Sequence, residues 1–165
     1  MIAIAGLIVC FDQIVKVYIH TDYAYGERNV VVDGFFYITH IRNPGAAFGI
    51  FRDASETFRK VFFLTMPMIA MGIILVLIYQ LKESDKAQLF ALSSIFGGAI
   101  GNYIDRVQYG FVIDYLDFTF AYNLPGLGKG IYSYPAFNIA DIAIVSGVGI
   151  LLLLMILEGR QAAKK

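Results

Sequence analysis

The chain has 165 residues, a length typical of one domain, and 58% of them are apolar while only 16% are charged. Average soluble domains are about 45–50% apolar and about 25% charged, so this composition indicates a membrane protein. The formal net charge is zero and neither sign forms a block, which sets nucleic-acid binding aside.

Four apolar stretches approach the roughly 20 residues that a helix needs to cross a bilayer. They cover residues 2–19, 61–81, 87–104 and 136–157. An even number of spans places both termini on one side of the membrane, which we expect to be the cytoplasm, and places the loops 20–60 and 105–135 on the other. The whole chain, 1–165, is then a single membrane domain.

The first span has no basic region before it and no small-residue cleavage site after it, so we expect a retained helix. Its single cysteine, Cys10, excludes disulfides within the chain and cysteine-rich metal sites. Asp12 and Lys16 are four residues apart and share a helix face. The simpler interpretation is a structural ion pair, with direct chemistry as the alternative.

The first long connection is rich in Val, Ile, Phe and Tyr over residues 30–42, which predicts short strands interrupted at Gly34 and lying on the membrane surface. Asn43-Pro44-Gly45-Ala46-Ala47-Phe48 follows. Its small residues would let the backbone approach a ligand, although composition alone favours a simple turn.

In the third span, Gly97 and Gly101 form a GxxxG pattern that permits close approach of another helix. Asn102, Asp105 and Arg106 then lie on one face of the helix end. A satisfied polar network is at least as good an interpretation of Asp105 and Arg106 as direct catalysis.

Tyrosines and phenylalanines crowd the second long connection, which predicts a membrane-parallel segment with a flexible glycine-rich loop over 125–130. The fold class expected is therefore an all-α four-helix transmembrane bundle with a small strand-rich extracytoplasmic platform and this membrane-parallel segment.

Asp114 and Asp141 differ from Asp12 and Asp105 because neither has a basic residue within one helical turn. Such carboxylates resist ionisation, and two that converge can share one proton and activate water for attack on a carbonyl. The competing use is an all-oxygen metal site in a phospholipid-type transferase, with Asp117 as a further ligand. A third hypothesis is a proton-coupled transporter, suggested by charged residues such as Asp12 and Lys16 within a span. The absence of internal repeats disfavours it.

Taken together, the motifs resemble those of the lipoprotein signal peptidases (signal peptidase II), which are bacterial intramembrane aspartyl peptidases. The matching residues run in the family's order over nearly the whole chain. They are Asp12-Gln13 and Lys16, Asn43-x-Gly45-Ala46-Ala47-Phe48, Gly97-Gly98-Ala99, Gly101-Asn102, Asp105-Arg106, Gly110, Val112, Asp114 and Phe137-Asn138-x-Ala140-Asp141.

The resemblance implies an endopeptidase of the bacterial inner membrane that removes the signal peptide from diacylglyceryl-modified prolipoproteins, just before the lipidated cysteine. It implies Asp114 and Asp141 as the catalytic dyad, no metal or other cofactor, and a site near the outer face of the membrane. Partners would be the prolipoprotein and membrane lipid, and we expect a monomer.

The remaining roles also follow from the resemblance. Asn43, Asn102, Arg106 and Asn138 would bind substrate or support the dyad, while Asp12, Lys16, Asp105 and Gly45 would be structural or supporting. The chain departs from the family pattern in two places. No basic residues precede the first span, and the 117–135 connection is long and glycine-rich.

Overall fold

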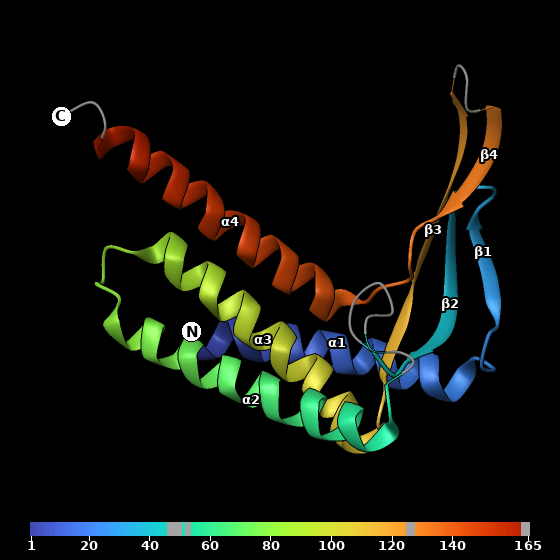
Figure 1. Cartoon of the computed structure of the whole chain (residues 1–165), viewed down its shortest axis with the longest axis horizontal. Helices are drawn as coiled ribbons and strands as arrows, with labels where there is room; N and C mark the ends of the chain where they lie inside the picture. The colour runs from blue at the N-terminus through green and yellow to red at the C-terminus, as the bar shows by residue number, and fades with distance from the viewer. Residues whose placement is uncertain (46–50, 52–53, 125–127, 163–165) are drawn as a thin grey trace.

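The computed structural model describes residues 1–45, 51, 54–124 and 128–162, which form four long helices and four strands (Figure 1). The helices are α1 (Ile2–Asp22), α2 (Glu56–Gln80), α3 (Lys86–Tyr109) and α4 (Ile139–Ala162). The strands are β1 (Arg28–Val32), β2 (Phe36–Asn43), β3 (Val112–Leu124) and β4 (Gly128–Ser133). Each predicted span corresponds to one helix.

Three helices are long and apolar enough to cross a membrane within the described residues, namely α1, α2 and α4. Their outward faces carry exposed apolar side chains, among them Leu7, Phe11, Val145 and Met155. Apolar surface of this extent is unfavourable in water and stable against hydrocarbon, so the chain is an integral membrane protein. The α3 helix is not among the three, and the four-span bundle stays a prediction.

The α3 helix is central, because it packs against α1, α2 and α4 (Figure 1). Its glycines make this possible. A Cβ atom on Gly97 would lie 2.9 Å from the Ala5 Cα atom of α1, and one on Gly98 would clash with the Ala140 carbonyl of α4. The predicted close approach at Gly97 and Gly101 is confirmed. The part of α3 between Ala91 and Asp105 that packs on its neighbours is shielded from lipid and can carry polar residues.

All four strands pair antiparallel in the order β1-β2-β3-β4. The sheet stands at one end of the helices, and α1 begins and α4 ends toward the opposite end (Figure 1). Pairing of β2 with β3 joins the two long connections, with Asn43 opposite Val112 and Ile41 opposite Asp114. The sheet therefore fixes the position of Asp114 relative to Asn43.

The strands predicted over residues 30–42 are confirmed, with the turn at Gly34, whose φ of 68° suits glycine. Strict alternation of faces fails beyond Ile38, because the β2 register shifts between Ile38 and Ile41 and leaves both Thr39 and His40 buried.

The second connection differs from its prediction. Residues 128–130, expected in a flexible loop, belong to β4, which pairs with β3 from Leu124–Gly128 to Thr119–Ser133. Cross-strand hydrogen bonds satisfy the backbone that the glycines would otherwise leave free. Ala46, Ala47 and Phe48 of the predicted motif, and Pro125, Gly126 and Leu127 of the glycine-rich stretch, lie outside the described residues.

Candidate active site

Helix α4 begins directly after Asn138, which caps it. The Asn138 Oδ1 atom accepts a hydrogen bond from the Asp141 backbone N–H at 2.9 Å. In return, the Asp141 Oδ2 atom accepts one from the Asn138 backbone N–H at 3.2 Å. This reciprocal pair is a capping box, which satisfies two of the N–H groups that every helix start leaves without partners. The same two side chains are thereby locked in orientation.

Two further N–H groups at the start of α4 are bound by distant segments. Asp12 of α1 accepts from the Ala140 N–H through Oδ1 at 3.0 Å, and the Tyr115 hydroxyl of β3 accepts from the Ile139 N–H at 3.2 Å. These contacts hold the start of α4 against both α1 and β3. The position of Asp141 therefore depends on three separate parts of the chain.

Asp114 lies on β3 and is only 2% exposed. Its Oδ1 atom accepts from Asn138 Nδ2 at 2.8 Å, and its Oδ2 atom accepts from Asn43 Nδ2 at 3.0 Å. Asn138 thus contacts both aspartates, so the residues at 114 and 141 converge on one amide. Burial and then the charge of Asp141 raise the pKa of Asp114 to about 7, while the two amides oppose the rise.

A buried lysine lies behind the aspartates. Lys16 Nζ contacts three acceptors at 2.9 Å: Asp12 Oδ2, Asp105 Oδ2 and Asn102 Oδ1. An ammonium group has three N–H donors, so each finds a partner, and the side chain is only 1% exposed. The predicted Asp12–Lys16 ion pair is present. Sequence spacing did not predict that Asp105 and Asn102 would complete its coordination.

Asn102 links this ion cluster to the aspartates. Its Nδ2 atom donates to Asp141 Oδ1 at 2.7 Å, while its Oδ1 atom accepts from both Lys16 and Asn138. Besides Lys16, the Asp105 carboxylate binds β3 and α1. It accepts hydrogen bonds from the Ile113 N–H at 3.0 Å and from Gln13 Nε2 at 2.9 Å. Asp105 therefore fixes β3 at Ile113, the residue directly before Asp114.

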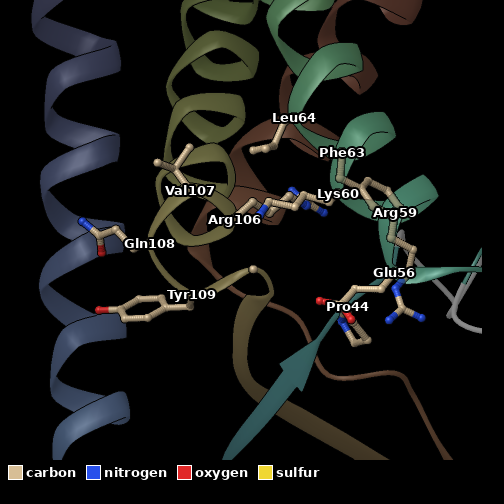
Figure 2. Close-up of a pocket in the computed structure, with 11 residues that line it drawn as sticks. Pro44, Glu56, Arg59, Lys60, Phe63, Leu64, Arg106, Val107, Gln108 and Tyr109 are labelled. Atoms are coloured by element: carbon tan, nitrogen blue, oxygen red, sulfur yellow. The ribbon is translucent and has the colours of Figure 1, made fainter.

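Arg106 lies on the other side of the site. Its guanidinium donates to the Gly45 and Asn102 carbonyl oxygens at 3.3 Å and stacks over the Phe63 ring, 4.9 Å from its centroid. Figure 2 shows Arg106 reaching from α3 into a pocket whose opposite wall is the first turns of α2. The lining includes Arg59, Lys60, Phe63, Leu64 and Val107.

Asp117 does not join the aspartates. It binds Arg28 Nε at 2.6 Å and Ser133 Oγ at 3.3 Å, within the sheet. Among the described residues, no group of three or more His, Cys, Asp or Glu side chains lies close enough to hold a metal ion. The alternative site of Asp114, Asp117 and Asp141 is therefore not assembled.

Two residues that were not predicted as site residues from the sequence, Tyr115 and Gln13, contribute to the site. Tyr115 caps α4, and its position directly after Asp114 was a signal that could have been used. Gln13 binds Asp105 and the Gly101 carbonyl, at 2.9 and 3.1 Å. It follows Asp12 in the chain, where a polar side chain inside an apolar helix indicates a buried partner.

Comparison with known proteins places these residues in a family. The family model described as signal peptidase (SPase) II matches residues 4–157. A lipoprotein signal peptidase of Syntrophus aciditrophicus is 41% identical over 157 residues, which cover 95% of this chain and 92% of that protein. One from Brevibacillus brevis is 40% identical over 159 residues, covering 96% and 95%.

Solved structures agree with this match. One described as a bacterial membrane enzyme, determined by the in meso method at 2.3 Å resolution, superimposes with a TM-score of 0.78 at 32% identity and covers 96% of this chain and 88% of that one. A second, at 1.9 Å resolution, has a TM-score of 0.77 at 29% identity and covers 93% and 90%.

Proposed function

The chain belongs to the signal peptidase II family of peptidases, and from this we propose that it removes signal peptides from diacylglyceryl-modified prolipoproteins by cutting just before the lipidated cysteine. The observation that carries the proposed mechanism is the convergence of Asp114 and Asp141 on Asn138. Burial of Asp114 beside the charge of Asp141 favours a state in which the two carboxyls share a single proton.

One shared proton is sufficient for the first half of peptide hydrolysis. The ionised carboxylate takes a proton from water as the water oxygen attacks the scissile carbonyl carbon. The protonated carboxyl gives its proton to the carbonyl oxygen, so a neutral gem-diol forms and the two aspartates exchange protonation states.

The second half returns the site to its starting state. The newly protonated carboxyl donates to the cysteine nitrogen as the C–N bond breaks, and the other carboxylate accepts a proton from the gem-diol. The products are the signal peptide, with a new carboxyl group, and a lipidated cysteine with a free amine. Every proton transfer is made by the dyad, so the proposed reaction needs no metal or other cofactor.

The surroundings of the dyad suit a substrate anchored in lipid. Acyl chains on the cysteine stay in the bilayer, so the peptide bond must be cut where apolar helices meet polar chain. The pocket beside Arg106 combines an apolar wall of Phe63, Leu64 and Val107 with basic side chains (Figure 2). We assign Arg106, together with Asn43 and Gly45, to holding the substrate backbone near the dyad.

The fold is consistent with an orientation that we propose for the chain in the membrane. The sheet and the start of α4 lie at one end of the bundle, and α1 begins and α4 ends toward the other (Figure 1). Asp114 is near the start of β3 and Asp141 is in the first turn of α4. With both termini in the cytoplasm, the dyad lies near the outer face of the bacterial inner membrane and the sheet forms a platform above it. A monomer holds every residue of the proposed site.

The test compares a lipidated precursor with the same precursor lacking the diacylglyceryl group, each with and without excess chelator. We expect cleavage of the lipidated form alone, unchanged by chelator. Equal cleavage of both forms contradicts the proposed substrate, and loss of cleavage in chelator contradicts the metal-free mechanism. Absence of any cleavage by correctly folded protein contradicts the proposed function.

A further inference from the structure

The hydrogen bonds around Asn102 can run in only one direction. Lys16 has no acceptor, so the Asn102 atom that faces it must be the amide oxygen. The amide nitrogen of Asn102 therefore faces Asp141 Oδ1, at 2.7 Å, and must donate to it. Lys16 thus determines that Asn102 presents a donor to the aspartate.

The bonds around Asn138 are fixed in the same way by a backbone donor. The Asp141 N–H can only donate, so the Asn138 atom that receives it is Oδ1, and Asn138 Nδ2 faces Asp114 Oδ1. The Asn138 N–H also donates to Asp141 Oδ2. Both carboxylate oxygens of Asp141 therefore accept hydrogen bonds. Oδ1 accepts from the Asn102 amide that Lys16 orients, and Oδ2 accepts from the Asn138 backbone N–H.

The two aspartates differ in their wider surroundings. Asp141 is in the first turn of α4, where the aligned peptide dipoles of a helix favour negative charge. Asp114 lies near the start of β3, is nearly inaccessible, and within the described residues its carboxyl receives hydrogen bonds from the neutral amides of Asn43 and Asn138. The two positions thus favour opposite charge states.

On these grounds we propose that Lys16 is a positioning residue which, through Asn102, holds Asp141 as the carboxylate base and leaves the shared proton on Asp114, the acid. The inference rests on the dyad function proposed above and deepens it. Lys16 acts mainly through the orientation of Asn102, because Asp12 and Asp105 compensate its charge.

The charged and titratable groups facing the pair come from three elements. They are Lys16 of α1, Arg106 of α3 and Tyr115 of β3, while Asp12 and Asp105 pair with Lys16. Arg106 interacts with both aspartates, so it does not by itself select which one is ionised.

The first test measures which aspartate retains a proton when its partner is replaced by asparagine. The infrared C=O band of a protonated carboxyl is followed against pH in Asp114→Asn and in Asp141→Asn. The double variant provides the background from other carboxyls. We expect the band to survive to higher pH in Asp141→Asn, which retains Asp114. The same range in both variants, or the reverse order, overturns the proposal.

The second test examines Lys16 and Asn102 in the Asp114→Asn background. Lys16→Met and Asn102→Leu should each extend the protonated range of Asp141 by about one pH unit, because a charge-assisted hydrogen bond is lost. Gln13→Leu is the matched control, since Gln13 binds the same cluster without facing Asn102, and it should cause no shift.

Asn102→Leu keeps both ion pairs of Lys16, so it remains informative where Lys16→Met does not fold. Absence of a shift in Asn102→Leu, or an equal shift in all three variants, overturns the proposed role. These measurements use no cleavage assay. A chain that titrates in the expected order but cleaves no precursor would contradict the proposed function alone.

Discussion

Asn138 and Asp141 bind each other twice across the first turn of α4, at 2.9 and 3.2 Å, and the same Asn138 side chain reaches Asp114 at 2.8 Å. A helix cap therefore also serves as the bridge between the two proposed catalytic residues. Because the cap has a defined geometry, the separation of the two carboxyls is set by the start of the helix rather than by a mobile loop.

Replacement of either dyad residue by asparagine should abolish cleavage. Asp114→Asn and Asp141→Asn each remove one proton-transfer group while retaining side-chain size, so we expect a loss of about 100-fold or more in kcat. Asp117→Asn on the same strand is the control and should remain active, because Asp117 binds Arg28 within the sheet. Cleavage is measured on a lipidated precursor in detergent. Full activity in either dyad variant contradicts the mechanism.

The pH dependence of cleavage should respond to Asn43. Loss of the Asp114 proton, whose pKa is about 7, predicts that kcat/KM falls above about pH 7. The Asn43 amide stabilises the ionised form and so opposes the rise in that pKa. Asn43→Leu should therefore move the basic limb upward, by up to about one pH unit. If the fall in kcat/KM instead begins at lower pH in Asn43→Leu, this account is contradicted, whether or not KM changes.

Stability should also depend on pH through Asp114. A carboxyl whose pKa is raised from 3.8 to about 7 by folding contributes stability at low pH that is lost as the pH rises between these values. Asn at this position does not titrate. The midpoint of thermal unfolding of Asp114→Asn should therefore rise relative to wild type between about pH 4 and pH 7. A constant difference across this range contradicts a raised pKa of Asp114 in the folded protein.

The contacts of α3 with its neighbours should be sensitive to single methyl groups. Gly101→Ala would place a Cβ atom 2.5 Å from Asp12 Oδ2, and Gly98→Ala would clash with the Ala140 carbonyl. We expect each to cost about 1–3 kcal/mol of stability and to lower activity by displacing the start of α4. Gly149→Ala is the control, because its added Cβ atom would meet no other described part of the chain within 4 Å beyond its own helix turn, and it should unfold at the wild-type temperature or above. The unfolding temperature measures the loss of stability, and the cleavage rate measures the loss of activity.

The sequence predicts the helices well because apolar length is a local property. It also indicates Asp114 and Asp141 as candidate catalytic residues, since each lacks a basic neighbour in the chain. Their meeting through Asn138 could not be derived from spacing, because it depends on how β3 is held against α4 by Tyr115 and by the Leu116–Phe137 bridge.

The features that were not predicted from the sequence have identifiable physical causes. The β3–β4 hairpin was not predicted because its tyrosines and glycines are equally typical of a segment at a membrane surface. Two of the three partners of Lys16, Asn102 and Asp105, were also missed. Asp12 is one turn away, whereas Asn102 lies 86 residues away in sequence and reaches Lys16 only through the glycine-mediated approach of α3 to α1.

The N–H groups that open α4 are bound by side chains from α1 and β3 as well as by Asn138. On the proposed mechanism, a nascent chain in the membrane would therefore have no working hydrolytic centre until its first and last helices have met. Completion of folding would then be the activating event.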